Sequence, residues 1–364
     1  MGFADFHGNK AVVTQLRQML GRGRLPHSIL LSGPEGVGKY RLALMMARAI
    51  NCAVQPVTDG LPDFCGVCGP CQRIGAAEDL FARVAEAVAA RDEMRDVDKR
   101  ETRILVQTDP DVLVIPPDPP QLLVKVGQVR TVIERSHRHP AERRRVFVFP
   151  EAKFMKEAAN SLLKVLEEPA DSTHLFLLAE HPGELLPTMR SRCVNFRLGA
   201  LEQSEIESLL AIEHPDWPPK QRQLVARLAQ GAPERALHFS LEEYQATRAD
   251  ALVLLRTALE ANDHTPLFKM TETYRAGAEG QQKMSSLLQA SALLLEDVLF
   301  VQHGVPEMAR NIDIISELER LASMASFTWV EQAAEGLGAV ESGMRRNLLR
   351  SLSLDAMTAR MEGV

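Results

Sequence analysis

Residues 33–40 read GPEGVGKY, and this segment constrains the fold of the chain more than any other. An apolar run at 28–31 precedes it, and a helical pattern of apolar residues follows it from residue 42. This is the strand–turn–helix context in which G-x-x-x-x-G-K-[ST] forms a phosphate-binding loop. The glycines let backbone N–H groups surround phosphate oxygens, and the helix N-terminus adds partial positive charge. The predicted phosphate-binding residues are Gly33, Gly36, Gly38 and Lys39.

The last position of this pattern normally holds Mg²⁺ through a Ser or Thr hydroxyl, but here it is Tyr40. A phenol is too long to place its oxygen beside the backbone at that point. A second strand, at 145–149, should end in acidic residues that support the metal and polarise water. It is followed instead by Pro150, which offers no ligand, and by Glu151, which is either a base or an exposed carboxylate at a helix start. We therefore expect no nucleotide hydrolysis at this site, while ATP binding stays open.

Four of the five cysteines are clustered with the spacing C-x12-C-x2-C-x2-C. In a cytosolic chain such a cluster indicates metal binding rather than disulfides. Four thiolates suit a closed, tetrahedral, structural zinc site, and an iron–sulfur or redox role is the alternative. The fifth cysteine, Cys193, is interpreted as a half-buried small apolar residue. The predicted zinc ligands are Cys52, Cys65, Cys68 and Cys71.

The first 200 residues alternate continuous apolar runs with helical patterns, which predicts an α/β domain with a parallel sheet covered by helices. Beyond them the pattern becomes helix after helix. We expect a helix over 157–168 that ends before Pro169. The candidate strands are 28–32, 111–115, 145–149 and 174–179.

These patterns predict three domains. The nucleotide-binding domain covers 1–198, with a zinc module at about 50–75 and a charged insertion at about 78–103. A small helical lid at 199–240 and an all-α domain at 241–364 follow. An apolar stripe in the insertion allows a projecting helix, and its simplest interpretation is a solvated element without a catalytic role.

The charge balance argues against several classes of function. A net charge of −6 and an aromatic content of 5% disfavour a dedicated duplex-binding domain and a base-stacking surface. The basic cluster at 130–145 could contact DNA phosphates, but Glu134 and Glu142 interrupt it, so a solvated face is the simpler interpretation. Without an apolar run of membrane-spanning length or a signal-peptide pattern, we expect a cytoplasmic protein with no membrane contact.

Residues 190–193 read Arg-Ser-Arg-Cys. An arginine can stabilise the transition-state charge on a neighbouring subunit's γ-phosphate, because guanidinium stays ionised and can bond two phosphate oxygens. So short a string is weak on its own, and a structural surface arginine is the alternative.

Together these residues resemble the bacterial DNA polymerase III clamp-loader subunits, and within them the delta-prime family. The resemblance covers most of residues 1–200 and only loosely includes Arg346-Asn347 and Leu352-Ser353-Leu354 near the end. The matching stretches are LPHS before GPEGVGK, Asn51-Cys52 with CGVCGPC, NSLLK with LEEP, and Ser191-Arg192-Cys193.

The resemblance implies an AAA+ module, a helical lid and a helical collar that assembles a ring with gamma/tau and delta subunits. In the family, this ring loads the sliding clamp on primed DNA during replication, and the polymerase activity of the holoenzyme resides in another subunit. Gamma/tau subunits are the ATP-hydrolysing motors, whereas delta-prime is a stator. The resemblance further implies that Arg192 is an arginine finger offered in trans and that the four clustered cysteines hold zinc.

Departures from the family pattern favour delta-prime over the motor. Tyr40 and Pro150 are wrong for a motor, and the expected lid arginine aligns with Glu234, one place before Arg235. Glu180-His181 stands where a polar sensor is expected. The alternative is a gamma/tau-type motor, which shares the finger motif and the cysteine cluster. A stand-alone zinc-dependent nucleic-acid binder has less support, because the chain is acidic and a four-thiolate site is closed.

Overall fold

A computed structural model describes residues 2–119, 121–260, 263–274, 277–344 and 350–362. Arg346 and Asn347, part of the loose resemblance near the end of the chain, lie outside these residues. The chain divides into two compact units. The first contains Met1–Leu209 and Gln230–Arg235, and the second contains Leu210–Ala229 and Ala236–Val364.

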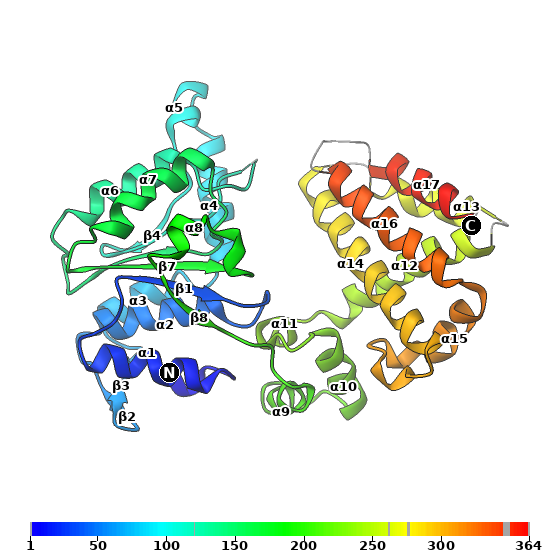
Figure 1. Ribbon diagram of the computed structural model, residues 1–364, viewed down its shortest axis with the longest axis horizontal. Helices are drawn as coiled ribbons and strands as arrows, with labels where there is room; N and C mark the ends of the chain where they lie inside the picture. Colours follow the sequence, from blue (N-terminus) through cyan, green and yellow to red (C-terminus); the bar gives the residue numbers. More distant parts are fainter. Residues whose placement is uncertain (1, 120, 261–262, 275–276, 345–349, 363–364) are drawn as a thin grey trace. The chain divides into compact units, whose positions relative to one another are not determined.

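Within the described residues, the first unit is built around a six-stranded sheet with the order β4-β5-β6-β7-β1-β8 (Figure 1). Strands β5 to β8 and β1 run parallel to their neighbours, whereas β4 pairs antiparallel with β5 at one edge. The four expected strands are confirmed as β1, β5, β6 and β7. The strands are β1 (Ser28–Ser32), β4 (Val106–Asp109), β5 (Val112–Val114), β6 (Arg145–Phe149), β7 (Thr173–Ala179) and β8 (Val194–Arg197).

The central strands are buried on both faces, which explains their continuous apolar sequences. In β1, Ile29 and Leu31 enter the core on one face of the sheet, and Leu30 enters the core on the other. In β6, Val146 and Phe147 are divided between the same two cores. Alternating side chains therefore serve two apolar layers, as parallel strands between helices require.

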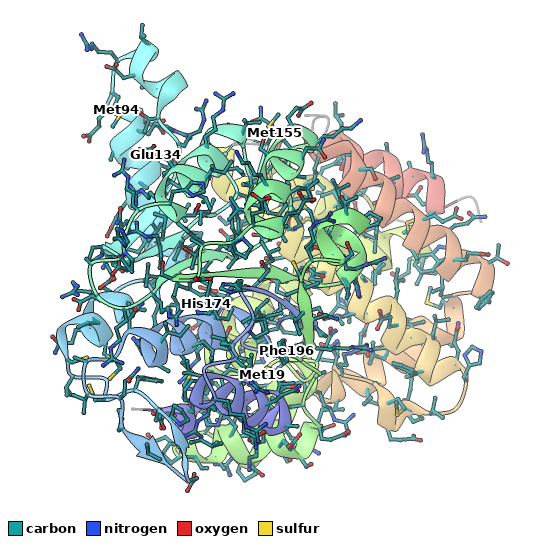
Figure 2. The ribbon with its side chains drawn as sticks, turned by 60° about the vertical axis from the view of Figure 1, so that its left-hand side comes forward. Met19, Met94, Glu134, Met155, His174 and Phe196 are labelled. Atoms are coloured by element: carbon teal, nitrogen blue, oxygen red, sulfur yellow. The ribbon has the colours of Figure 1, made fainter. Side chains whose placement is uncertain are left out.

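Helices cover both faces of this sheet. Figure 1 shows α6 (Val126–Ser136) and α7 (Lys156–Glu167) on one face, and α1 (Lys10–Gly21), α2 (Lys39–Asn51) and α3 (Gly69–Gly75) on the other. On the α1 side of the sheet, Phe196 of β8 is part of the core, and Met19 of α1 packs against this core (Figure 2). The expected helix before Pro169 is confirmed as α7.

Two smaller features extend the first unit. The hairpin of β2 (Val57–Thr58) and β3 (Leu61–Pro62) lies between α2 and α3 in the sequence. The charged insertion forms α4 (Leu80–Asp92) and α5 (Asp96–Glu101), which project from the unit (Figure 1). No residue of α4 is fully buried, but Leu80 and Val84 pack against the core of the unit, so the expected solvated insertion stays a prediction.

The second unit is all-helical within its described residues. Its core includes Leu254, Leu294 and Trp329, contributed by three helices. The helices are α10 (Pro219–Leu228), α12 (Leu241–Glu260), α13 (Thr265–Glu272), α14 (Gly277–Gln302), α15 (Ile315–Met324), α16 (Phe327–Met344) and α17 (Arg350–Met361). The division between the units passes through α9 (Gln203–Glu213), while α11 (Pro233–Leu237) begins in the first unit. The expected boundaries of the lid, 199–240, and of the last domain, 241–364, stay predictions.

One helix among the described residues is long and apolar enough to cross a membrane by length and composition. It is the Gln282–Gln302 part of α14, and 50% of its most apolar window is buried. Leu287 and Leu294 of this helix lie in the core of the second unit, which is the environment of a core helix in a helical domain.

Candidate functional site

The predicted phosphate-binding loop has the backbone conformation that its glycines allow. Gly38 has φ 92° and caps α2, which begins at Lys39. Gly33 has φ 149°, and a Cβ atom there would lie 2.1 Å from the carbonyl oxygen of Leu198. Both positions therefore require glycine. The strand–loop–helix arrangement expected from the sequence is confirmed.

The amine of Lys39 is bonded to its own loop. Its Nζ donates hydrogen bonds to the carbonyl oxygens of Gly33 at 2.5 Å and Pro34 at 2.7 Å. Burial lowers the pKa of Lys39, and the nearby carboxylates of Glu180 and Glu35 oppose this shift. A bound phosphate would have to replace these two carbonyl bonds.

Tyr40 directs its hydroxyl away from the phosphate loop. The phenolic oxygen donates a 2.7 Å hydrogen bond to the carbonyl oxygen of Ala77, two residues after α3 ends at Gly75. Burial, followed by the charge of Glu78, raises the pKa of Tyr40, so the phenol stays protonated at neutral pH. The residue in the usual Mg²⁺-ligand position is therefore engaged in a structural bond.

A pocket of about 580 Å³ lies beside the loop. Its lining brings together the predicted residues Gly36, Lys39, Tyr40 and Glu151 with Pro150. The charged residues that line it are predominantly acidic, because five glutamates face two lysines and one arginine. They are Glu35, Glu151, Glu180, Glu184 and Glu234, with Lys39, Lys153 and Arg235.

Two of the three cations that line this pocket have carboxylate partners, and the third, Lys39, is bonded to carbonyl groups of its own loop. Lys153 donates to Glu151 at 2.9 Å, and this bond raises the pKa of Lys153. Arg235 lies 3.7 Å from a carboxylate oxygen of Glu35. Because paired cations offer less positive potential to a polyphosphate, the pocket is poorly suited to bind triphosphate tightly.

The lid and sensor departures also face the pocket. The backbone N–H of Glu234 donates to the carbonyl oxygen of Gly36 at 3.1 Å, so this segment is bonded directly to the phosphate loop. Burial raises the pKa of the Glu234 carboxyl, against the opposing charges of Arg41 and Lys39. Glu180, at the end of β7, lines the same pocket. Glu234 and Glu180, which belong to the two departures that the resemblance indicated, thus both contribute carboxyl groups to this pocket.

The four clustered cysteines come together in space as the sequence predicted. Their Sγ atoms all lie within 4.8 Å of one another, and those of Cys52 and Cys68 are 3.9 Å apart. Zn–S bonds of about 2.3 Å in a tetrahedron place sulfur atoms about 3.8 Å apart. The donor set and its spacing therefore fit a zinc ion held by Cys52, Cys65, Cys68 and Cys71.

Backbone amides point at two sulfur atoms of this cluster and favour the thiolate form of Cys65. Gln55 N–H and Cys65 N–H point at Cys52 Sγ at 3.3 Å and 3.4 Å. Backbone N–H groups of Val67 and Cys68 lower the pKa of Cys65 to about 6. Thiolates are the form that binds zinc, so these bonds favour metal coordination.

Arg192 lies on the surface, after the short helix α8 (Pro187–Arg190). Its Nη1 donates to the carbonyl oxygen of Thr188 at 2.7 Å, and its Nη2 lies 2.6 Å from Glu167 Oε1 at the end of α7. Arg192 is not among the described residues that line the pocket beside the phosphate loop. The predicted finger is thus separate from the pocket of its own chain.

The neighbouring Cys193 is half-buried against the core, and burial raises its pKa to about 11. This agrees with its interpretation as a small apolar residue.

The basic cluster at 130–145 does not form one uniform face. Arg145 is buried, with Nη2 donating to the His139 carbonyl oxygen at 2.8 Å and lying 3.4 Å from Asp111. Arg138 pairs with Glu134. Contact between this cluster and DNA stays a prediction.

Sequence reasoning missed two partners. Glu167 belongs to the recognised Leu-Glu-Glu-Pro stretch, but nothing in its sequence context indicates that it pairs with Arg192. Glu184 caps the end of β7 by accepting N–H bonds from Glu180 and His181, and it lines the pocket as well. The contact of Glu167 depends on the fold, because it joins the end of α7 to the turn after α8, whereas the Glu184 contacts are local, within four residues of their donors.

Comparisons with known proteins fit this geometry. The chain is 28% identical to the DNA polymerase III subunit tau of Escherichia coli K12, over 85% of this chain and 48% of that protein. It is 30% identical to the delta' subunit of Pseudomonas aeruginosa, over 59% and 56%, and 25% identical to that of Bacillus subtilis, over 85% and 83%. The chain spans about half the length of the tau proteins it matches.

A solved DNA polymerase III gamma subunit-related protein from Thermotoga maritima aligns over 96% of this chain and 98% of its own, with 17% identity and a TM-score of 0.45. The sequence relatives include both tau and delta' subunits, so similarity alone does not separate these two roles. The expected fold class, a P-loop (AAA+) α/β domain followed by helical parts, is confirmed. A family described as "DNA polymerase III, delta subunit" matches residues 8–202 of the 364-residue chain. The chain therefore belongs to this family of bacterial clamp-loader subunits.

Proposed function

We propose that the chain is a delta-prime (stator) subunit of a DNA polymerase III clamp loader. In this role it assembles with gamma/tau and delta subunits in the cytoplasm, and Arg192 reaches the nucleotide of a neighbouring ATPase subunit. The sliding clamp and primed DNA are contacted through the complex. The family and the delta' relatives support this assignment, together with the chemistry of the nucleotide pocket.

The observation that carries the proposal is the hydrogen bond between Tyr40 and Ala77. An active phosphate loop needs a short hydroxyl side chain at this position to hold Mg²⁺. Here the position has a long side chain whose hydroxyl is engaged at 2.7 Å with a carbonyl group elsewhere. Without that ligand, the metal that neutralises charge during phosphoryl transfer loses its principal support.

A second change acts on the same chemistry. Pro150 stands where an acidic metal support is expected, and Glu151 is paired with Lys153 at 2.9 Å. This pairing engages the carboxylate that would otherwise orient an attacking water. Neither the metal nor the attacking water has the partner that hydrolysis needs.

The four-cysteine cluster has a structural role in this proposal. Zinc bound by four thiolates has no open coordination position for a substrate. It would connect the end of α2, through Cys52, to α3, through Cys71. Since Tyr40 bonds to the segment just after α3, the metal would also hold Ala77 in place.

The second candidate is an ATP-hydrolysing gamma/tau-type motor. The glycine conformations of the loop, the retained Lys39 and the pocket of about 580 Å³ favour it. It would require Mg²⁺ to bind without the usual hydroxyl and Lys39 to leave its two carbonyl partners.

Equilibrium binding of ATP to the purified chain, with and without Mg²⁺, tests the proposal, with a turnover assay on the same sample. The proposal predicts no turnover, and ATP binding that is absent or indifferent to Mg²⁺. Mg²⁺-dependent binding with turnover that Lys39→Ala abolishes would establish the motor instead.

A further inference from the structure

The guanidinium group of Arg192 is held at two points by its own chain. Nη1 donates to the carbonyl oxygen of Thr188 at 2.7 Å, with a longer 3.4 Å contact to Ser191 Oγ. Nη2 lies 2.6 Å from Glu167 Oε1. One contact comes from the turn that carries Arg192, and the other comes from a separate helix.

Both anchors stand on well-packed elements. Glu167 is the last residue of α7, directly after Leu166, which is 5% exposed. Thr188 lies in α8, directly before Met189, which is fully buried. The backbone segments that carry both acceptors are therefore fixed by the core on the α7 side of the sheet, which contains Leu166 and Met189.

This arrangement leaves donor capacity on the guanidinium. Arginine carries five N–H bonds. The hydrogen bond to Thr188 uses one of them on Nη1, and the ion pair with Glu167 lies at Nη2. The side chain is 35% exposed, so the remaining N–H groups are accessible to a ligand. A planar group held at two points has little rotational freedom left, which is the condition for preorganised recognition of a phosphate.

We infer that Glu167 is a positioning residue for Arg192, fixing its guanidinium so that the remaining N–H groups meet the phosphates of a neighbouring subunit's nucleotide. This inference rests on the proposed function of Arg192 as an arginine finger and adds a second residue to it. Glu167 itself does not touch the nucleotide.

The exposure of the pair argues that this contact orients Arg192 more than it stabilises the fold. Glu167 is 49% exposed and Arg192 is 35% exposed, and ion pairs reached by solvent contribute little to folding. A variant at Glu167 is therefore expected to fold and assemble. If the carboxylate acted only as a competitor of the phosphate, its removal would instead raise turnover.

The test uses the reconstituted loader, with ATP, clamp and primed DNA, and compares Glu167→Ala, Glu167→Gln, Arg192→Ala and the double variant Glu167→Ala/Arg192→Ala. Glu168→Gln is the matched control, because it removes the adjacent exposed carboxylate of the same helix end. Gel filtration of each complex verifies assembly. Glu167→Gln keeps the size and one acceptor oxygen, so it replaces Glu167→Ala if the alanine variant does not assemble.

We expect Glu167→Ala to lower kcat. On a logarithmic scale, the decrease should be about half or more of the decrease caused by Arg192→Ala. The reason is that misplacement of a catalytic group by about 1 Å can cost on the order of 100-fold in rate. The KM for ATP should not change, Glu168→Gln should match wild type, and the double variant should match Arg192→Ala.

Wild-type or higher turnover with Glu167→Ala, while Arg192→Ala is impaired, would overturn the positioning role and leave the finger intact. A further loss in the double variant would also overturn it, because Glu167 would then act independently. If Arg192→Ala itself turned over ATP normally, the finger and this inference would both fail.

Discussion

The hydroxyl of Tyr40 donates a 2.7 Å hydrogen bond to the carbonyl oxygen of Ala77. This bond joins the first turn of α2, at the phosphate loop, to the segment after α3, which carries Cys71. In an active phosphate loop, the side chain at this position would bind Mg²⁺. In this chain the phenol at the same position bonds the segment that follows α3, so its hydroxyl is engaged in a structural contact.

Tyr40→Phe should therefore destabilise the protein without reducing the ATPase activity of the loader. Loss of the hydroxyl leaves the Ala77 carbonyl without this donor, which costs about 1 kcal/mol in the free energy of unfolding. Urea denaturation of the purified chain measures the change, and turnover of the reconstituted loader is the second readout. Lower loader turnover with unchanged stability would contradict this account of Tyr40.

Removal of zinc should lower the thermal stability of the chain. Metal analysis of the purified protein is expected to find one zinc ion per chain, because the four Sγ atoms form one cluster. Cys68→Ser should lose the metal and melt at a lower temperature, since one of four ligands is missing. Cys193→Ser is the control, because Cys193 lies outside the cluster, and it should retain zinc. Zinc-free protein, or equal metal loss in both variants, would rule out this site.

Acidification should destabilise the first unit through His174. This residue is 5% exposed, and burial lowers its pKa from 6.5 to about 4. Above pH 6.5 the imidazole is neutral in both the folded and the unfolded chain, so the full stability is present. Between pH 6.5 and 4 only the unfolded chain takes up the proton, and the free energy of unfolding falls with falling pH.

The comparison of His174→Gln with wild type isolates this contribution. Glutamine does not titrate, and its amide can still donate to the Pro26 carbonyl oxygen that His174 contacts at 3.0 Å. Urea denaturation at pH 7 and pH 5 should show a smaller loss of stability in this variant. The exposed His137 provides the control variant His137→Gln, which should lose as much as wild type. Equal losses in all three proteins would refute the assignment.

The parts of the fold that the sequence predicts correctly are those whose signal is local. Strands β1 and β6 are buried along their whole length, so each reads as a continuous apolar run. The cysteine cluster is equally evident, because its ligands are close in sequence. In contrast, β8 has mostly exposed residues, and β4 joins the sheet through antiparallel pairing with β5. Assigning β4 and β8 as strands requires knowledge of which strands they pair with, and the local sequence pattern does not contain this information.

In the candidate site, too, only the features with a local sequence signal could be predicted. The sequence predicts that Tyr40 is unsuited to bind Mg²⁺, because residue type alone decides it. The groups that Tyr40 and Arg192 contact in the folded chain could not be predicted from the sequence. Ala77 and Glu167 come from other parts of the fold, and packing of helices on the sheet places them there.

The most direct test of the stator assignment compares two variants of this chain in the reconstituted loader, with ATP turnover measured in the presence of clamp and primed DNA. Lys39→Ala removes the predicted phosphate-binding amine of this chain's own pocket, and Arg192→Ala removes the proposed arginine finger. The account predicts normal turnover with Lys39→Ala, and with Arg192→Ala a loss of roughly 1,000-fold or more at the one site that the arginine serves. Impaired turnover with Lys39→Ala would contradict the stator assignment and identify the chain as a motor, and normal turnover with Arg192→Ala would refute the role of Arg192 as a finger.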